Sequence, residues 1–195
     1  MRVLVGCEWS GTVRDAFRRR GHEAWSCDLL GPDDLPDEFR AQTWPNYHYE
    51  GDVLDFLSEG WDLFIAFPPC THLAVSGARY FAQKKHEQRI ALNFVRKLMD
   101  APVPRIAVEN PVGVISTKIR KPDQIIQPWM FGHGETKTTC FWLKGLPKLK
   151  PTDVVKGREQ RIWKMGPSPQ RAMLRGKTYR GIAEAMAEQW GRVSP

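Results

Sequence analysis

Residues 1–11 read MRVLVGCEWSG, in which a short apolar run, Arg2–Gly6, leads directly into a turn. The following residues, 10–20, place apolar side chains at helical spacing, with Ser10 in position to cap the helix and Gly21 in position to end it. A buried strand that turns tightly into a helix is the first half of a strand–helix–strand unit. The opening of the chain therefore predicts the start of a parallel sheet.

The same alternation of short β-rich runs and helical stretches continues along the chain. Further strands are expected at Glu23–Cys27, His48–Glu50, Leu63–Phe67, Arg105–Val108 and Thr138–Leu143. Further helices are expected at Gln83–Met99 and at Tyr179–Trp190, the second capped by Thr178, and loops at 31–37 and 144–177. This order predicts an α/β fold with a mostly parallel central sheet and helices on both faces. The length of 195 residues suits a single domain, 1–195.

The composition is that of a soluble globular protein, with 42% hydrophobic and 26% charged residues. No apolar run approaches the ~20 residues of a membrane span, and the apolar start is too short for a secretion signal. The cysteines are widely spaced without a CxxC pair, which argues against a zinc site and against a disulfide framework. They are Cys7, Cys27, Cys70 and Cys140. We therefore expect a cytoplasmic protein with no membrane partner and no metal.

The net charge of +7 is distributed unevenly along the chain. Residues 1–60 carry 6 Lys and Arg against 12 Asp and Glu, whereas residues 156–180 carry 8 basic side chains against one acidic side chain. A concentrated basic segment with an interleaved tryptophan suits a phosphate backbone, although a solvated basic loop gives the same pattern. The segment 144–177 is thus the candidate DNA-binding region. Its expected contact residues are Arg158, Arg161, Trp163, Lys164, Arg171 and Arg175.

Polar or reactive residues follow the ends of the first five expected strands. They are, in chain order, Cys7 and Glu8, Asp28, Asp52, Cys70, and Glu109. Ligands of open parallel sheets bind beyond the carboxyl ends of the strands. This convergence predicts a ligand site at that edge of the sheet.

Two of these residues are candidates for chemistry. Cys70 follows Pro68 and Pro69 just past a buried strand, so a thiol nucleophile would be held at a rigid position. A lone cysteine is more often a buried structural residue. Glu109 precedes Asn110 at the exit of another apolar run, where a carboxylate is costly to bury unless it is paired or protonated. It is either a proton donor or a salt-bridged or helix-capping residue.

The motifs Pro68-Pro69-Cys70 and Glu109-Asn110-Pro111 resemble the signatures of DNA cytosine-5 methyltransferases, and Ser76-Gly77 resembles the family's continuation after the cysteine. The resemblance covers residues 1–143, and small phage-type members are the most similar in size. It implies a Rossmann-like methyltransferase fold in a bacterial or phage-infected cell, and transfer of a methyl group from S-adenosylmethionine to a flipped cytosine in DNA. Cys70 would be the nucleophile, with Glu109 and Asn110 beside the base.

The same resemblance assigns a cofactor site. The first turn would hold the methionine part, although only two glycines of the family's pattern remain; it comprises Gly6, Cys7, Glu8, Trp9, Ser10 and Gly11. Asp28 would bind the ribose, and Asp52 with Val53 the adenine, while both aspartates also suit local helix caps. Pro68 and Thr178 would complete the cofactor site. Lys137 matches the family's basic motif near the base, or is an exposed strand lysine.

Other functions remain open from the sequence alone. The same fold could act on a free pyrimidine nucleotide, or transfer a modified group from an S-adenosylmethionine derivative. A non-enzymatic DNA-binding decoy is a further alternative, although the presence of both Cys70 and Glu109 argues against it. A Rossmann dehydrogenase is disfavoured because no GxGxxG follows the first strand.

Overall fold

The computed structural model describes residues 1–31, 47–166 and 171–192, so most of the predicted loop at 31–37 lies outside the described residues. The strands are β1 Arg2–Gly6, β2 Glu23–Asp28, β3 His48–Glu50, β4 Leu63–Ala66, β5 Ile106–Pro111, β6 Gln124–Ile126 and β7 Thr139–Lys144. The helices are α1 Thr12–Arg19, α3 Lys85–Met99, α4 Ile115–Lys118, α5 Arg161–Lys164, α6 Arg171–Gly176 and α7 Arg180–Gln189. Short 3-10 helices lie at Val53–Phe56 (η3), Val75–Tyr80 (η4) and Pro128–Met130 (η5).

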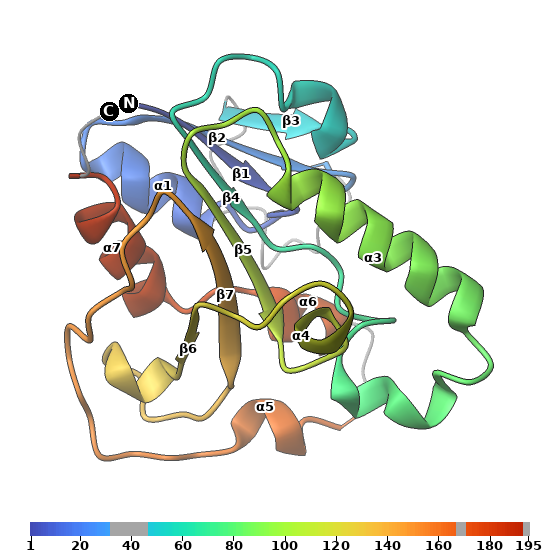
Figure 1. Ribbon diagram of the computed structural model, residues 1–195. Coiled ribbons are helices and arrows are strands. Elements are labelled where there is room, and N and C mark those ends of the chain that lie inside the picture. The colour runs from blue at the N-terminus through green and yellow to red at the C-terminus, as the bar shows by residue number, and fades with distance from the viewer. Residues whose placement is uncertain (32–46, 167–170, 193–195) are drawn as a thin grey trace.

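The strands form one seven-stranded sheet in the order β3-β2-β1-β4-β5-β7-β6. The first five strands of this order are parallel, and β7 runs antiparallel to both of its neighbours. Figure 1 shows α1 and α7 on one side of the sheet and α3 on the other. The predicted α/β fold, with a mostly parallel sheet and helices on both faces, is confirmed.

The alternation of side chains along β1 explains why both faces are covered. Val3 and Val5 pack into the cluster that includes α1 and α7, whereas Leu4 packs into the cluster that includes α3. All three side chains are completely buried. A strand that is apolar on both faces is typical of a parallel sheet with helices on either side.

The parallel strands place their carboxyl ends at one edge. Gly6 at the end of β1 lies opposite Cys27 of β2 and Ala66 of β4, and Ala66 lies opposite Val108 of β5. The residues that follow these strands therefore come together, as the sequence predicts.

Three sequence predictions are wrong in detail. The segment 144–177 contains the short helices α5 and α6 and is not loop throughout. The helix predicted to start at Ser10 begins at Thr12 without a side-chain cap from its N-cap residue, Gly11. Thr178 does not cap the last helix either, because Tyr179 occupies the N-cap position and makes no side-chain cap. Strand β6, at 124–126, was not predicted from the sequence.

Candidate active site

The turn after β1 depends on close packing and on unusual backbone angles. A Cβ atom on Gly6 would lie 2.6 Å from a side-chain carbon of Val53, so a larger residue would push the two segments apart. Gly11 has φ 62°, which glycine adopts without strain. Cys7 has φ 56° without being a glycine, a conformation that costs energy and is concentrated at functional sites.

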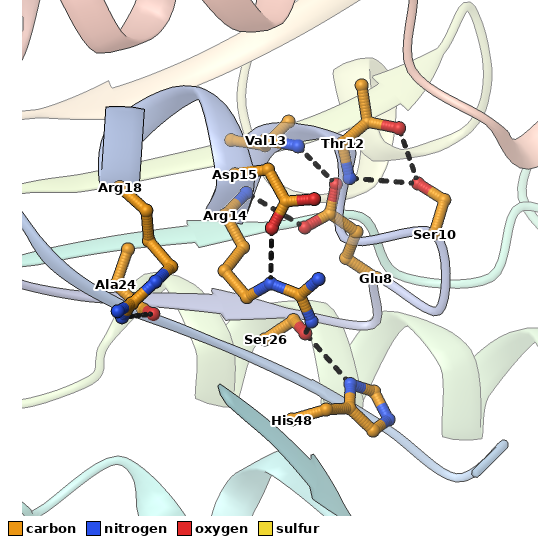
Figure 2. A network of polar contacts seen from close by, with 10 residues as sticks. All are labelled: Glu8, Ser10, Thr12, Val13, Arg14, Asp15, Arg18, Ala24, Ser26 and His48. Atoms are coloured by element: carbon orange, nitrogen blue, oxygen red, sulfur yellow. Dashed lines mark hydrogen bonds and ion pairs between the residues drawn. The ribbon is translucent and has the colours of Figure 1, made fainter. Parts of the chain in front are cut away.

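Glu8 caps helix α1 from within this turn (Figure 2). Its carboxylate accepts hydrogen bonds from the backbone N–H of Val13, at 2.6 Å, and from that of Arg14, at 3.2 Å. Burial raises the pKa of Glu8 to about 7. Ser10 instead bonds the backbone N–H and the hydroxyl of Thr12. Glu8 thus takes the capping role that the sequence suggested for Ser10.

A cavity of about 440 Å³ lies beyond the ends of β1, β2 and β3. Four of the predicted cofactor residues line it, namely Cys7, Asp28, Asp52 and Val53. The other predicted cofactor residues do not line it; they are Gly6, Glu8, Trp9, Ser10, Gly11, Pro68 and Thr178. A cavity is therefore present at the edge of the sheet where the strand ends predict a ligand site, and its lining residues lie toward β2 and β3 more than in the first turn.

The chemistry of the cavity wall fits S-adenosylmethionine. Asp28 and Asp52 provide carboxylates for ribose hydroxyls, an amino group or a sulfonium charge, and the remaining wall is mostly apolar, as an adenine ring requires. Burial raises the pKa of Asp28. Each aspartate also accepts a local backbone hydrogen bond at 3.0 Å, from Leu30 and Leu54 respectively. The local capping role and the predicted ligand role are therefore compatible.

Helix α3 supplies one wall that the sequence analysis missed. Glu87, Ile90, Ala91 and Phe94 line the cavity at the spacing of one helix face. Ile90 is 56% exposed, although it is a large apolar residue. The apolar residues on that face of α3 are the sequence signal that could have indicated a cavity wall, because the core does not cover them. The remaining unpredicted lining residues are Cys27, Leu29, Gly51, Pro69 and His72.

Cys70 follows β4 next to the cavity, because its neighbour Pro69 is part of the cavity wall. The thiol is half-buried. Burial and the negative charge of Glu109 raise the pKa of Cys70, while the positive charges of Arg175 and Lys137 oppose that rise. The folded chain thus brings Cys70 and Glu109 together with two cations from distant segments.

Asn110 ties the end of β5 to the segment that carries the cysteine. Its side-chain nitrogen donates to the carbonyl oxygen of Pro68 at 2.8 Å, and the residue is completely buried. The side-chain oxygen of Asn110 has no hydrogen-bond partner in the described part of the chain. Burial raises the pKa of Glu109 next to it, and Lys137 opposes that rise.

Lys137 is not an exposed strand lysine, because it precedes β7 and is half-buried. Its Nζ donates to the backbone carbonyl of Arg175 on α6 at 2.8 Å. Lys137 and Glu109 line a second, much smaller cavity of about 10 Å³ with Thr178 and Tyr179. That volume suits about one water molecule. Thr178 therefore lies beside Glu109 rather than in the larger cavity.

The predicted DNA-binding residues fall into two groups. Arg158 and Lys164 are exposed, and the Arg158 guanidinium stacks 3.9 Å from the ring centre of Trp129. Arg161 is exposed but pairs with Glu135 at 3.0 Å. The second group is half-buried and consists of Arg171 and Arg175 on α6. The side chain of Trp163 lies outside what the structure describes.

Neither a membrane span nor a metal cluster occurs among the described residues. None of their helices combines the length and the apolar composition needed to cross a bilayer. Nor do they contain a group of three or more His, Cys, Asp or Glu side chains that could hold a metal ion.

The sheet order, the single reversed strand β7 and the helices on both faces define the Rossmann-like S-adenosylmethionine-dependent methyltransferase fold. Comparison with protein-family models gives no match, and comparison with curated protein sequences gives none either. Solved structures, in contrast, do share the fold.

Three of these structures are methyltransferases. The Entamoeba histolytica methyltransferase EhMeth has a TM-score of 0.56 and 13% identity over 80% of this chain. The S. pombe Dnmt2 methyltransferase has a TM-score of 0.51 and 15% identity over 84% of this chain. A putative DNA modification methyltransferase encoded within an E. coli prophage has a TM-score of 0.50 and 13% identity over 86% of this chain. The matches cover 55%, 57% and 54% of the prophage, Entamoeba and S. pombe chains, so this chain spans little more than half of each. At such identities the likeness establishes the fold, while substrate and activity depend on the site.

Proposed function

We propose that this chain transfers a methyl group from S-adenosylmethionine to carbon 5 of cytosine in DNA, with Cys70 as the nucleophile. The proposal depends most on one observation: the wall of the larger cavity and the proposed nucleophile meet at residues 69 and 70. Pro69 belongs to the wall of the larger cavity, and Cys70 lies within the electrostatic influence of Glu109. A cofactor in that cavity and a base held by Glu109 would therefore meet at Cys70.

In the proposed reaction, the thiolate of Cys70 forms a bond to carbon 6 of the cytosine ring. Protonated Glu109 gives its proton to N3, so the ring becomes an enamine whose carbon 5 is nucleophilic. The raised pKa of Glu109 favours the protonated form that this step needs. Lys137 and Arg175 favour the thiolate form of Cys70 by their charge.

S-adenosylmethionine supplies the methyl group from its sulfonium when it is bound in the cavity. Water then takes the proton from carbon 5, the electrons of that bond restore the ring double bond, and the bond between Cys70 and carbon 6 breaks. Glu109 recovers its proton from N3. Both side chains thus end the cycle in the state in which they began.

DNA is the substrate that best explains the basic segment. Arg158, Lys164 and Arg161 lie on the exposed part of the segment 144–177, where phosphate groups can reach them. Cytosine inside a duplex cannot reach a half-buried thiol, so the base would have to be extruded toward Cys70. The prophage methyltransferase of the same fold is, by its description, a DNA modification enzyme, which supports this choice.

The decisive experiment uses the purified chain with methyl-labelled S-adenosylmethionine and DNA, followed by digestion to nucleosides. We expect label in 5-methylcytosine for the native protein and none for Cys70→Ala, which should still bind the cofactor. Cys140→Ala is the matched control, because that thiol is buried in the core away from the cavity wall. Label in another nucleoside, or undiminished transfer by Cys70→Ala, would overturn the proposal.

DNA containing 5-fluorocytosine tests the covalent step separately. Fluorine at carbon 5 cannot leave as a proton does, so the adduct between protein and DNA should accumulate. Peptide mapping should place the adduct at Cys70. A free cytidine nucleotide incubated in parallel tests the alternative substrate, because a nucleotide enzyme would label it without DNA.

A further inference from the structure

A chain of polar side chains connects helix α1 with the loop that borders the larger cavity, and Figure 2 shows it from Arg14 to His48. It starts at Arg14, whose side chain is completely buried. Arg14 Nε donates to Asp15 Oδ1 at 2.8 Å, and Arg14 Nη1 donates to Ser26 Oγ at 2.9 Å. Ser26 Oγ lies 2.8 Å from Nδ1 of His48, and Nε2 of His48 lies 3.0 Å from the carbonyl oxygen of Leu30.

The groups at the two ends set the direction of the hydrogen bonds in this chain. A guanidinium can only donate, so the Ser26 oxygen accepts from Arg14. The Leu30 carbonyl can only accept, so the imidazole of His48 carries a proton on Nε2. In the neutral imidazole Nδ1 is then unprotonated and accepts the hydroxyl proton of Ser26. The network thus assigns the tautomer of neutral His48.

The far end of the chain is part of the cavity wall. The Leu30 backbone N–H donates to Asp28 Oδ1 at 3.0 Å, while the Leu30 carbonyl oxygen accepts from His48. Both backbone polar groups of Leu30 are therefore engaged. Asp28 and Leu29 line the cavity, but His48 does not. His48 can therefore act on a ligand through its hydrogen bond to residues 28–30.

We infer that His48 is a positioning residue for the cofactor, which in its neutral form holds residues 28–30 so that Asp28 faces the ligand. This inference rests on the proposed function, because it takes the ligand to be S-adenosylmethionine. The buried guanidinium of Arg14 is costly to desolvate, and it orients the Ser26 hydroxyl by donating to the Ser26 oxygen.

Protonation of His48 would change the arrangement. Nδ1 would then donate to the Ser26 oxygen, the hydroxyl proton would lose its acceptor, and a second positive charge would lie near the Arg14 guanidinium. The charged groups that act on His48 are Arg14 from α1, Asp28 from β2 and Glu50 from β3. Burial is the largest effect and lowers the pKa of His48, so the neutral form predominates at neutral pH.

The test measures binding of S-adenosylmethionine and S-adenosylhomocysteine by calorimetry at pH 7.5 and 5.5. For His48→Phe we expect about tenfold weaker binding at pH 7.5 than for the native protein, the scale of one lost buried hydrogen bond. The native protein should lose affinity at pH 5.5, and His48→Phe should lose less. The matched control is His22→Phe, because His22 packs on Phe17 beside α1 and does not line the cavity. It should bind like the native protein at both pH values.

A second variant covers the case in which His48→Phe does not fold. Ser26→Ala keeps the imidazole and removes the hydroxyl that joins it to Arg14, so it should weaken cofactor binding by a similar factor. Nitrogen NMR of the ring should show a proton on Nε2 in the native protein and a mixture of tautomers in Ser26→Ala. Native-like affinity in both variants, or a native ring protonated at Nδ1, would overturn the inference while the proposed function stands. Failure of the native protein to bind either compound would overturn both.

Discussion

The proposed role of Glu109 as a proton donor depends on the groups that surround its carboxyl group. Glu109 is a half-buried residue in the C-terminal half of β5, where desolvation raises its pKa and Lys137 is the cation that acts on it. We expect Glu109→Gln to reduce the rate of methyl transfer by roughly two to four orders of magnitude, the scale of a positioned acid or base. The amide keeps the size of the side chain but cannot give up a proton to N3.

Single-turnover transfer with bound cofactor measures this effect. The affinity of Glu109→Gln for S-adenosylmethionine serves as the control and should be unchanged, because Glu109 does not line the larger cavity. A decrease of less than tenfold in the rate of methyl transfer would mean that Glu109 has a structural role only.

Two cations set the reactivity of Cys70 before any DNA is present. Removing the charge of Arg175 or Lys137 should raise the pKa of the thiol further, because both oppose the rise that burial causes. Arg175→Met and Lys137→Met should each slow alkylation of Cys70 at pH 8 by roughly three- to tenfold, which corresponds to half a pKa unit to one unit. Arg180→Met is the control, since that side chain is 75% exposed and pairs with Glu184.

Mass spectrometry of the peptide that contains Cys70 gives the rate of alkylation. Arg175 was expected from the sequence to contact DNA, and its electrostatic effect on Cys70 gives it a second role. Equal alkylation rates in the native protein and in both variants would mean that neither cation affects the pKa of Cys70. Contact with DNA would then be the one proposed role of Arg175.

At the scale of single elements, helix α1 depends on the buried cap of Glu8. The pKa of Glu8 is about 7 in the folded chain, against 4.5 for a free side chain, so the folded state holds the proton more tightly. Stability from this group is therefore greatest at low pH and declines as pH rises from 4.5 to 7. The full decline is on the order of 3 kcal/mol.

Urea unfolding of the native protein and of Glu8→Gln at pH 5 and pH 8 isolates this contribution, because the amide does not titrate. The stability of Glu8→Gln relative to the native protein should increase from pH 5 to pH 8. A constant difference between the two proteins would show that Glu8 has an ordinary pKa.

Periodicity was sufficient to predict the elements that build the core. Strand β1 and helix α3 are apolar runs with a clear period, and the structure places them close to the predicted bounds. Helices α5 and α6 were missed because each has fewer than two full turns and lies in a segment rich in Pro, Gly and basic residues. Strand β6 has three residues and pairs only with β7, so its sequence alone carries little signal.

The candidate site was predictable in part for the same reason. Asp28 and Glu109 lie in the C-terminal parts of β2 and β5, Asp52 and Cys70 follow β3 and β4, and parallel strands bring their ends together. The role of Glu8 was not predictable, because a carboxylate after a strand suits a ligand contact as well as a cap. The apolar face of α3 was visible in the sequence, but its position against the strand ends required the tertiary structure, because that face is separated in sequence from every strand end that it joins.

At the scale of the whole molecule, the exposed basic residues of the segment 144–177 form the candidate DNA surface. Arg161 is already paired with Glu135, and Glu135 also accepts a hydrogen bond from the Tyr179 hydroxyl at 2.7 Å. Among the described residues Arg158 and Lys164 have no acidic partner, although Arg158 also donates to the carbonyls of Val155 and Gly157, so their charges are better placed to meet phosphates. Arg158→Gln combined with Lys164→Gln should weaken binding to all DNA sequences alike and reduce the salt slope by roughly one to two.

Filter binding at several salt concentrations measures that slope. Arg180→Gln is again the control, because its guanidinium pairs with Glu184 on the same helix. A double variant that discriminates among sequences less well, but keeps the native salt slope, would show that these residues read bases instead of phosphates.

The same segment limits how much sequence the protein can read. A long target requires many contacts to base edges, each worth about 1–3 kcal/mol of discrimination. Fewer than 40 residues separate β7 from Thr178, and many of their side chains are Lys and Arg, which mostly position the duplex through its phosphates. We therefore expect a short or degenerate target around the methylated cytosine. Methylation of a random-sequence DNA library, mapped at single-base resolution, measures the target directly. A strict site of six or more defined base pairs would contradict this expectation and would place recognition outside the segment 144–177.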